Sequence, residues 1–517
     1  MLRVRLPSRS VTSPDVLFSP DRKALDGYWL EGYGYAITPQ EAQQIRDAAV
    51  EITRLFVAAM DYITSHDEVL FKISITGKKE QDRKILELAR TSWKSENIEE
   101  LTYKISRSGE NGDDIKITQE GQRTRQTGQP QSYVLDRWDL AWDGINPPKL
   151  LERNFGFLGL ILVTGPYQER YVSWLKRQPG YADVETFGDL GRAFQNSFRQ
   201  VADEAGLARG KKVAVTVSPN HPGLLGGEMR RTGQLVARWI GAAGYRAVTL
   251  RVDGILIDVE SKRTAVVRTY DWMSGKKKSE KKSDKKEGHK FSFHLMTYST
   301  LNVPHIFPYY SVDNYTYNAA YEGSRIPFCD FKTQSLVPFW AVLMSNKGMM
   351  AVMHDLFPDH PNLLPTVLGS TGFRGQKRIV KLMAGRQGRG HRLYGANNRL
   401  LNKREDGKGA KTAHTRHHVT QTFSEAVNGA AGGYKIFSLF TANGQAAALG
   451  AQEATGPFVG NDDAKGHFLP VIVAPEMMIE KMEKAEEIEN PIDPIMSIMQ
   501  LLSSRVITKQ LMKALGP

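Results

Sequence analysis

The sequence predicts an α/β fold in which helices and sheets form separate layers. The main observation is a strand–helix–strand alternation, with an apolar run at 212–218, a helical pattern at 226–244 and a second apolar run at 247–252. Such alternation is typical of helices that cover a sheet. A second observation is the segment 432–452, where two strand patterns flank Asn443-Gly444. This dipeptide favours a tight hairpin turn, so we expect two paired strands there.

Three further helices follow from apolar residues spaced three and four apart. The first is expected at 38–64, with Thr38 as its N-cap and Pro39 in the first turn, where proline is favoured. The others are expected near 80–95 and 187–205. Each pattern supplies one apolar face that can pack on a sheet.

Composition excludes several classes of protein. The chain has 517 residues, of which 41% are hydrophobic and 24% charged, as is usual for a globular protein and unlike a disordered one. Its single cysteine, Cys329, excludes a disulfide framework and a thiolate metal cluster, and is expected to be a packed thiol. No apolar stretch reaches the roughly 20 residues that span a bilayer, and the N-terminus lacks the apolar core of a secretory signal. We therefore expect a cytoplasmic protein without membrane association.

The positive charge is concentrated in two places. The overall charge is +13, but residues 274–290 hold eight lysines against three acids and residues 374–416 hold thirteen basic residues against two acids. These stretches are net +5 and +11, so the rest of the chain is slightly acidic. A phosphate-rich ligand is expected near one or both. Residues 274–290 are expected to form a solvated loop, and nucleic-acid binding through these stretches is a weaker alternative.

Two neighbouring strand patterns carry oxygen-bearing side chains. Residues 134–142 and 148–151 are expected to pair as a hairpin. Glu152 and Asn154 are two residues apart and would share one face, where Asp139 of the other strand can join them. Two carboxylates and an amide are ligands that suit Mg²⁺ held jointly by protein and phosphates.

An arginine accompanies this group. Arg137 lies two residues before Asp139, so it would share the same face and could contact a phosphoryl group with its two-pronged guanidinium. The spacing alone leaves an alternative open, namely a surface hairpin with ordinary ion pairs.

A second group of candidates is a glycine-rich loop. Lys381 ends an apolar strand pattern and is followed by Gly385, Arg386 and Gly388. Backbone N–H groups and fixed positive charge in such a loop can close over a polyphosphate. The order of a P-loop is absent, and an exposed or RNA-binding loop remains an alternative.

Two further groups carry weaker signals. Asn346-Lys347 lies within the apolar stretch 336–360, where the lysine is expected to follow a strand, and a lysine after a strand is usually a solvated turn residue. His414, His417 and His418 suggest a metal site, but no fourth ligand is evident, so that interpretation is not favoured.

Taken in order, these segments resemble the glutathionylspermidine synthase family, whose synthetase domain is a rearranged ATP-grasp fold. The likeness begins at 26–31, continues through 137–154 and 268–272, and is strongest over 338–364 and 380–390. It divides the chain into an N-terminal segment at 1–20, an ATP-grasp-like body at 21–475 that contains the 274–290 insertion, and a tail at 476–517. The tail places six methionines among Glu and Lys and is expected to form a helical arm that lies on the body or on a partner, which could be a second copy or a larger assembly.

The resemblance implies an ATP- and Mg²⁺-dependent carboxylate–amine ligase. In this family a carboxylate attacks the γ-phosphate, an acyl phosphate forms, and an amine displaces phosphate to give an amide. The implied Mg²⁺ ligands are Asp139, Glu152 and Asn154, and Arg137 is the implied phosphate-contacting arginine. The acceptor, a small peptide or amine, stays open.

The resemblance also implies an ATP site. Lys347 and Lys381 match the lysines that contact the ATP phosphates, and Arg386 with Gly385 and Gly388 matches a mobile loop that closes over the nucleotide. The likeness thus assigns ATP to residues that the local patterns had also singled out.

The chain departs from the family pattern at two places. Residues 155–159 read FGFLG, whereas the family has an acidic and hydroxyl-rich run that meets its peptide substrate. Gln452 occupies the position of a catalytic family arginine. These departures favour an alternative, a catalytically degenerate ATP-grasp protein that serves as a scaffold in a larger assembly.

Overall fold

The computed structural model describes most of the chain. The described residues are 1–9, 29–74, 79–93, 102–108, 114–121, 132–155, 160–217, 224–251, 255–258, 263–266, 305–308, 334–336, 340–384, 388, 390–404, 417–429, 433–458 and 466–489. Outside them lie the insertion at 274–290, the family-like segments 26–28 and 268–272, residues 156–159, Cys329, Gly385, Arg386, His414 and the tail beyond 489.

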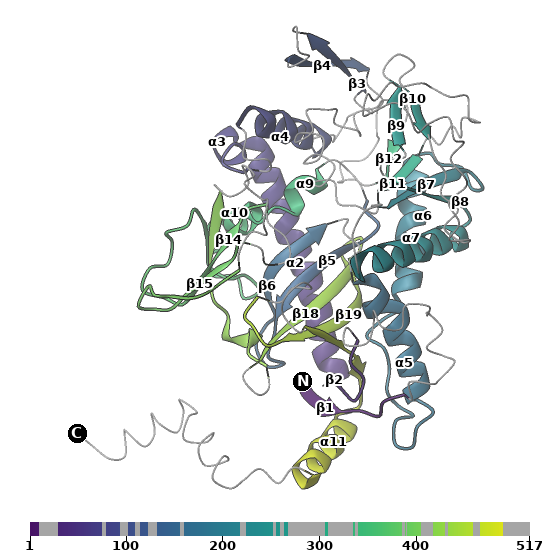
Figure 1. Cartoon of the computed structure of the whole chain (residues 1–517), viewed down its shortest axis with the longest axis vertical. Helices are drawn as coiled ribbons and strands as arrows, with labels where there is room; N and C mark the ends of the chain where they lie inside the picture. The colour runs from purple at the N-terminus through teal and green to yellow at the C-terminus, as the bar shows by residue number, and fades with distance from the viewer. Residues whose placement is uncertain are drawn as a thin grey trace, which may run out of the picture.

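A five-stranded antiparallel sheet lies at the centre of the molecule (Figure 1). Its strands, in order across the sheet, are β20 (His467–Leu469), β19 (Gln445–Ala454), β18 (Tyr434–Ala442), β5 (Asp136–Ala141) and β6 (Lys149–Phe155). Both predicted hairpins are confirmed. Asn443 and Gly444 have φ values of 48° and 80°, the left-handed conformation that a two-residue hairpin turn requires.

One long helix, α2 (Pro39–Ser65), covers one face of this sheet. It begins where predicted, because the Thr38 side chain accepts a hydrogen bond from the Glu41 N–H while the Glu41 carboxylate accepts one from the Thr38 N–H. Phe56 packs against Trp138 of β5, with ring centroids 6.5 Å apart. The short α3 (Asp67–Leu70) and α4 (Lys79–Trp93), the helix predicted at 80–95, follow.

A four-stranded parallel sheet accounts for the predicted strand–helix–strand alternation. Its order is β12 (Gln334–Ser335), β11 (His305–Pro308), β7 (Lys212–Val217) and β8 (Arg246–Arg251). Helices α6 (Leu190–Glu204) and α7 (Leu224–Ala242) accompany it. Helix α6 starts three residues later than predicted because the Asp189 carboxylate caps it by accepting from the Arg192 N–H.

A second five-stranded antiparallel sheet lies beside strand β6 of the central sheet (Figure 1). Its order is β13 (Thr366–Leu368), β17 (His418–Thr422), β14 (Arg378–Leu382), β15 (Arg392–Tyr394) and β16 (Leu400–Lys403). Lys381 Nζ of β14 donates to Leu151 O of β6 (3.0 Å), and Leu150 N of β6 donates to Asn362 O (2.9 Å) in the segment that precedes β13. Strand β14 is therefore held against the edge of the central sheet.

The apolar stretch 336–360 corrects one prediction. We expected a strand that ends at Asn346-Lys347, but the stretch contains two helices, α9 (Ala341–Met344) and α10 (Gly348–Leu356), with Lys347 between them. Nearly all of its residues from 340 to 353 are buried. A helix that is buried on every side lacks an amphipathic period, so its sequence looks the same as that of a buried strand.

The remaining elements lie around these layers. They are β1 (Leu2–Arg5), β2 (Tyr33–Ile37) and β21 (Val471–Val473) in one sheet, the pairs β3 (Thr102–Ser108) with β4 (Asp114–Gly121) and β9 (Ile255–Asp258) with β10 (Arg263–Val266), the π-helical turn η1 (Val163–Tyr167), α5 (Gln168–Leu175), the 3₁₀ turn η5 (Glu425–Val427) and α11 (Glu476–Glu489). Met478, Ile479 and Met482 of α11 pack on the apolar cluster around Val4. The first helix of the tail therefore lies on the body (Figure 1).

These layers confirm the predicted α/β class. Parallel strands with helices and two five-stranded antiparallel sheets occur in one chain, and one large apolar core extends from α2 to the parallel sheet. Within the part of the chain that the structure describes, none of the helices combines the length and apolar character that crossing a membrane requires.

Candidate functional site

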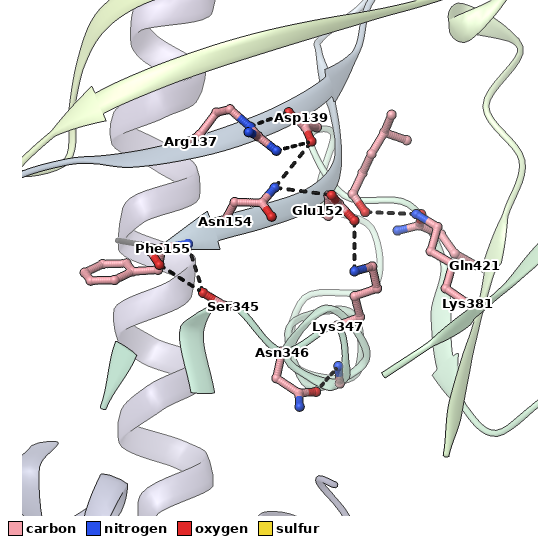
Figure 2. A network of polar contacts seen from close by, with 12 residues as sticks. Arg137, Asp139, Glu152, Asn154, Phe155, Ser345, Asn346, Lys347, Lys381 and Gln421 are labelled. Atoms are coloured by element: carbon pink, nitrogen blue, oxygen red, sulfur yellow. Dashed lines mark hydrogen bonds and ion pairs between the residues drawn. The ribbon is translucent and has the colours of Figure 1, made fainter. Parts of the chain in front are cut away.

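The pleat of β5 and β6 sends the predicted metal-binding side chains to the face opposite α2. Asp139 pairs across the strands with Glu152, and Arg137 pairs with Asn154. Because directly paired residues share a face, all four side chains lie together, as Figure 2 shows. The surface-hairpin alternative is wrong, since these groups are at least half-buried and Arg137 is only 7% exposed.

A network of hydrogen bonds connects these groups. Arg137 donates to both carboxylate oxygens of Asp139, from Nε (3.1 Å) and Nη2 (3.2 Å). Asn154 Nδ2 donates to Asp139 Oδ2 (3.3 Å) and to Glu152 Oε1 (3.2 Å), so one amide bridges the two carboxylates. Ser438 of β18 donates to Asp139 Oδ1 (3.0 Å). Sequence reasoning missed Ser438, because only the register of β18 against β5 places it opposite Asp139.

Lys347 reaches this network from the junction of α9 and α10. Its Nζ lies 2.9 Å from Glu152 Oε2, and the residue is 5% exposed, so its interpretation as a solvated turn residue is wrong. The junction is fixed on both sides of the lysine: Lys347 N donates to Met383 O (2.9 Å), and Gly348 N donates to Asn346 Oδ1 (2.8 Å). A side chain at Gly348 would meet Ile73, which explains the glycine there.

Lys381 reaches the site from strand β14. Its Nζ donates to Leu151 O (3.0 Å) and to Gln421 Oε1 (2.7 Å), and the residue is 5% exposed. Gln421 Nε2 donates in turn to Thr366 Oγ1 (3.2 Å), so strand β17 orients the lysine (Figure 2). Sequence reasoning also missed Gln421; a polar residue amid a buried strand was the available signal.

The glycine-rich loop is described in part. Gly385 and Arg386 lie outside the described residues, whereas Gly388 has a φ of 69°, in the left-handed region where glycine is unstrained. His391, which follows this loop, is 7% exposed and was not predicted as a site residue. It lies close enough to Lys381 and Glu152 to interact with them electrostatically.

Gln452 lies on the same face of the central sheet as the carboxylates. Ser438, which contacts Asp139, pairs with Gly450 of β19, and Gln452 follows Gly450 by two residues. Residues two apart in a strand share a face, so the glutamine points to the side of the site, two strands away from β5. It is 7% exposed. Its catalytic role stays a prediction.

Burial and neighbouring charge shift the protonation of the site. Burial raises the pKa of Asp139, and the Glu152 carboxylate adds to this effect, while Arg137 partly offsets it. Burial acts in the same direction on Glu152, but Lys347 and Lys381 outweigh it and hold the pKa of Glu152 well below its usual range. Burial lowers the pKa of Lys381 to about 8. Three basic side chains, those of Arg137, Lys347 and Lys381, thus lie around the two acidic side chains of Asp139 and Glu152, and this excess of basic groups favours an anionic ligand.

The residues fit a magnesium ion in their donor chemistry. Asp139 and Glu152 offer adjacent carboxylates whose mutual repulsion a cation would relieve, and Asn154 can offer its amide oxygen by rotating the amide. Among the described residues no three His, Cys, Asp or Glu side chains gather as a metal site. Two carboxylates and an amide would therefore share the ion with water or phosphate, as Mg²⁺ usually does.

The fold and the site define an α/β protein with a carboxylate and lysine site between two antiparallel sheets. Residues 315–474 match a family model described as glutathionylspermidine synthase preATP-grasp. This region, which supplies Lys347, Lys381 and Gln452, is glutathionylspermidine synthase-like, as the sequence resemblance predicted, and the description agrees with the expected ATP-grasp-like fold.

Two solved structures are similar to the chain. A glutathione synthetase-like effector from Globodera pallida has a TM-score of 0.43 and 10% identity, covering 90% of this chain and 98% of that chain. A putative gamma-glutamylcysteine synthetase from Methylobacillus flagellatus has a TM-score of 0.34 and 10% identity, covering 64% of this chain and 77% of that chain.

Proposed function

We propose that the chain is an ATP- and Mg²⁺-dependent ligase that joins a carboxylate to an amine. One observation carries the proposal: the carboxylates of β5 and β6 meet two buried lysines from segments about 200 residues downstream, inside the region that resembles the synthase family. In such a reaction a substrate carboxylate oxygen attacks the γ-phosphorus and ADP leaves. The amine nitrogen then attacks the acyl carbon, and phosphate leaves as the amide forms.

The acidic and the basic side chains of the site would bind different parts of the metal–nucleotide complex. Asp139, Glu152 and Asn154 would hold Mg²⁺, which when bound supplies positive charge to the phosphate oxygens. Lys347 and Lys381 would contact the phosphates of the nucleotide. None of these groups needs to act as a nucleophile, because the protein's task is to align the reactants and neutralise charge.

The ion pairs of the site suggest how binding proceeds. Without ligand, Arg137 neutralises Asp139 and Lys347 neutralises Glu152. A metal–nucleotide complex offers a cation to the two carboxylates and an anion to Arg137 and Lys347. Each of these side chains would then leave its ion pair for a partner in the ligand, and no buried charge would be left unpaired. Binding of the metal alone or of the nucleotide alone would leave a buried charge unpaired, and an unpaired buried charge is unfavourable in free energy. We therefore expect Mg²⁺ and nucleotide each to raise the affinity for the other.

Gln452 favours a second candidate, a nucleotide-binding scaffold protein that has lost ligase activity. A neutral side chain there would stabilise the transferring phosphoryl group less than an arginine. Phe155 supports the same alternative, because it is buried against Tyr133 and Trp340, with centroids 4.7 and 5.0 Å away, and so cannot contact a peptide substrate.

Thermal unfolding tests the nucleotide site. Mg-ATP at 100 times its Kd should stabilise the protein by about 2.7 kcal/mol. ATP with EDTA should stabilise it much less, and Asp139→Asn should abolish the effect. Asp189→Asn is the matched control, because an asparagine also caps a helix and the Asp189 carboxylate accepts from Arg192 N at the start of α6 rather than from a residue of the site. No stabilisation of the wild-type protein by Mg-ATP would refute both candidates.

Turnover separates the two candidates. ADP release is measured with a panel of carboxylate peptides and amines. Release that requires both substrates and is lost in Lys381→Ala identifies a ligase. Stabilisation by Mg-ATP without ADP release from any pair supports the scaffold instead.

A further inference from the structure

His391 is a buried polar group to which the proposed ligase chemistry gives no task. The residue is 7% exposed, and its Nε2 has no hydrogen-bond partner among the residues that the structure describes. Most buried polar atoms in proteins are paired, because an unpaired one loses its bonds to water without compensation. An orphaned nitrogen beside a ligand-binding site therefore points to a ligand as its partner.

The imidazole is held in place by its surroundings. His391 N donates to Gly388 O (3.1 Å), and His391 O accepts from Arg404 N (2.9 Å). The ring stands edge to face against Phe458, with centroids 5.7 Å apart. The backbone on both sides and the ring contact thus fix His391 at the end of the glycine-rich loop.

The charges around His391 select an anionic partner. Lys381, Lys347 and Arg404 act on the ring with positive charge, and the Glu152 carboxylate acts on it with negative charge. Burial, together with the two lysines, holds the pKa of His391 well below its usual range, so the ring is neutral at pH 7 and keeps one N–H donor. In this positive field an anionic oxygen is a more favourable neighbour than another donor.

We infer that Nε2 of His391 donates a hydrogen bond to the phosphate chain of the bound nucleotide. This inference rests on the proposed function, because Lys347 and Lys381 are the groups assigned to those phosphates. The imidazole N–H of His391 would be a neutral hydrogen-bond donor to the phosphates, in addition to the ammonium groups of Lys347 and Lys381.

Calorimetric titration with Mg-ADP tests the inference. His391→Phe should weaken binding about 10- to 100-fold, the loss expected for a hydrogen bond to a charged group. The melting temperature without ligand should stay the same or rise, since the substitution removes an unpaired buried nitrogen. His391→Gln, which keeps an N–H donor, should recover most of the affinity. His354→Phe is the matched control, because Nδ1 of His354 in α10 is likewise buried and unpaired in the described part of the chain.

Each outcome has a distinct meaning. Magnesium tripolyphosphate should show the same deficit in His391→Phe as Mg-ADP; a deficit confined to Mg-ADP would overturn the phosphate assignment. Equal affinity of wild type and His391→Phe would overturn the inference and leave the proposed function standing. A large fall in the unliganded melting temperature of both His391 variants would indicate a packing role and overturn it too. A wild-type protein that binds no Mg-ADP would refute the proposed function itself.

Discussion

Strands β5 and β6 carry two arginine–aspartate ion pairs on opposite faces of the sheet. The two pairs contain the same residue types but differ in burial and in the side chains that surround them. On the α2 face, Arg153 lies 2.5 Å from Asp136, with side chains 1% and 0% exposed. On the other face, Arg137 lies 3.1 Å from Asp139, with side chains 9% and 14% exposed. Adjacent residues thus enter two environments, because successive side chains of a strand point to opposite sides.

The surroundings decide what each pair can do. The Arg153 guanidinium lies over the ring of Phe56, 4.2 Å from its centroid, and Asp136 also accepts from the Thr441 hydroxyl. These partners are apolar or already bonded within the core, so the pair is structural. Asp139 instead accepts a hydrogen bond from Asn154, and Lys381 of the second antiparallel sheet lies nearby. That pair can exchange partners with a ligand.

The largest expected change in stability comes from breaking the buried ion pair between Arg153 and Asp136. Arg153→Met should destabilise the protein by about 3–5 kcal/mol, because it leaves Asp136 as an unpaired buried charge. Arg137→Met should cost far less stability, because Asp139 can take up a proton in its partly open site. Chemical denaturation of both variants measures the difference.

The double variant Arg153→Met/Asp136→Leu serves as the control. Apolar replacement of both members of a buried pair is often close to neutral, so much of the lost stability should return. Equal losses in Arg153→Met and Arg137→Met would contradict the distinction between the two faces.

An intermediate effect is expected from pH, through Lys381. Its pKa is about 8 in the folded protein and 10.5 when exposed, so the unfolded chain binds more protons between these values. The stability that Lys381 contributes is therefore fully present above about pH 10.5 and is lost as the pH falls through about 8. Phosphate binding needs the ammonium form, so Mg-ADP affinity should fall by up to about tenfold per pH unit above 8.

Two variants isolate this effect. Lys381→Met should lack the wild-type gain in stability between about pH 8 and 10, measured by denaturation at each pH. Lys381→Arg keeps its charge at high pH, so its Mg-ADP affinity should change little across the same range. A wild-type affinity that does not fall above pH 8 would show that Lys381 does not contact the phosphates.

The sequence predicted the parts of the site that depend on local patterns. Thr38 and Pro39 located the start of α2, and Asn443-Gly444 located the central hairpin, because capping and turn formation involve residues that are close in the chain. The two-residue spacing of Glu152 and Asn154 was enough to place them on one face. Lys347 was found as a candidate, although the helix–helix junction that positions it was mistaken for the end of a strand.

The parts that were missed depend on contacts between distant segments. Ser438 acquires its role from the register of β18 against β5, and Gln421 from the pairing of β17 with β14. His391 lies one residue beyond the glycine-rich pattern and becomes a candidate only because its nitrogen is buried without a partner among the described residues. Neither register nor burial can be read from spacing along one segment.

The smallest expected effect comes from two hydroxyl groups of strand β18, one on each face of the central sheet. Ser438→Ala removes one hydrogen bond to Asp139, so Mg-ADP affinity should fall by about fivefold, equivalent to ~1 kcal/mol, with little change in stability. Thr441→Val removes the hydroxyl that Asp136 accepts from in the core, so it should lower stability by about 1–3 kcal/mol and leave affinity unchanged. Titration and denaturation of both variants measure the two effects. If Thr441→Val changed affinity while Ser438→Ala did not, the assignment of ligand binding to the face of Asp139 would be wrong.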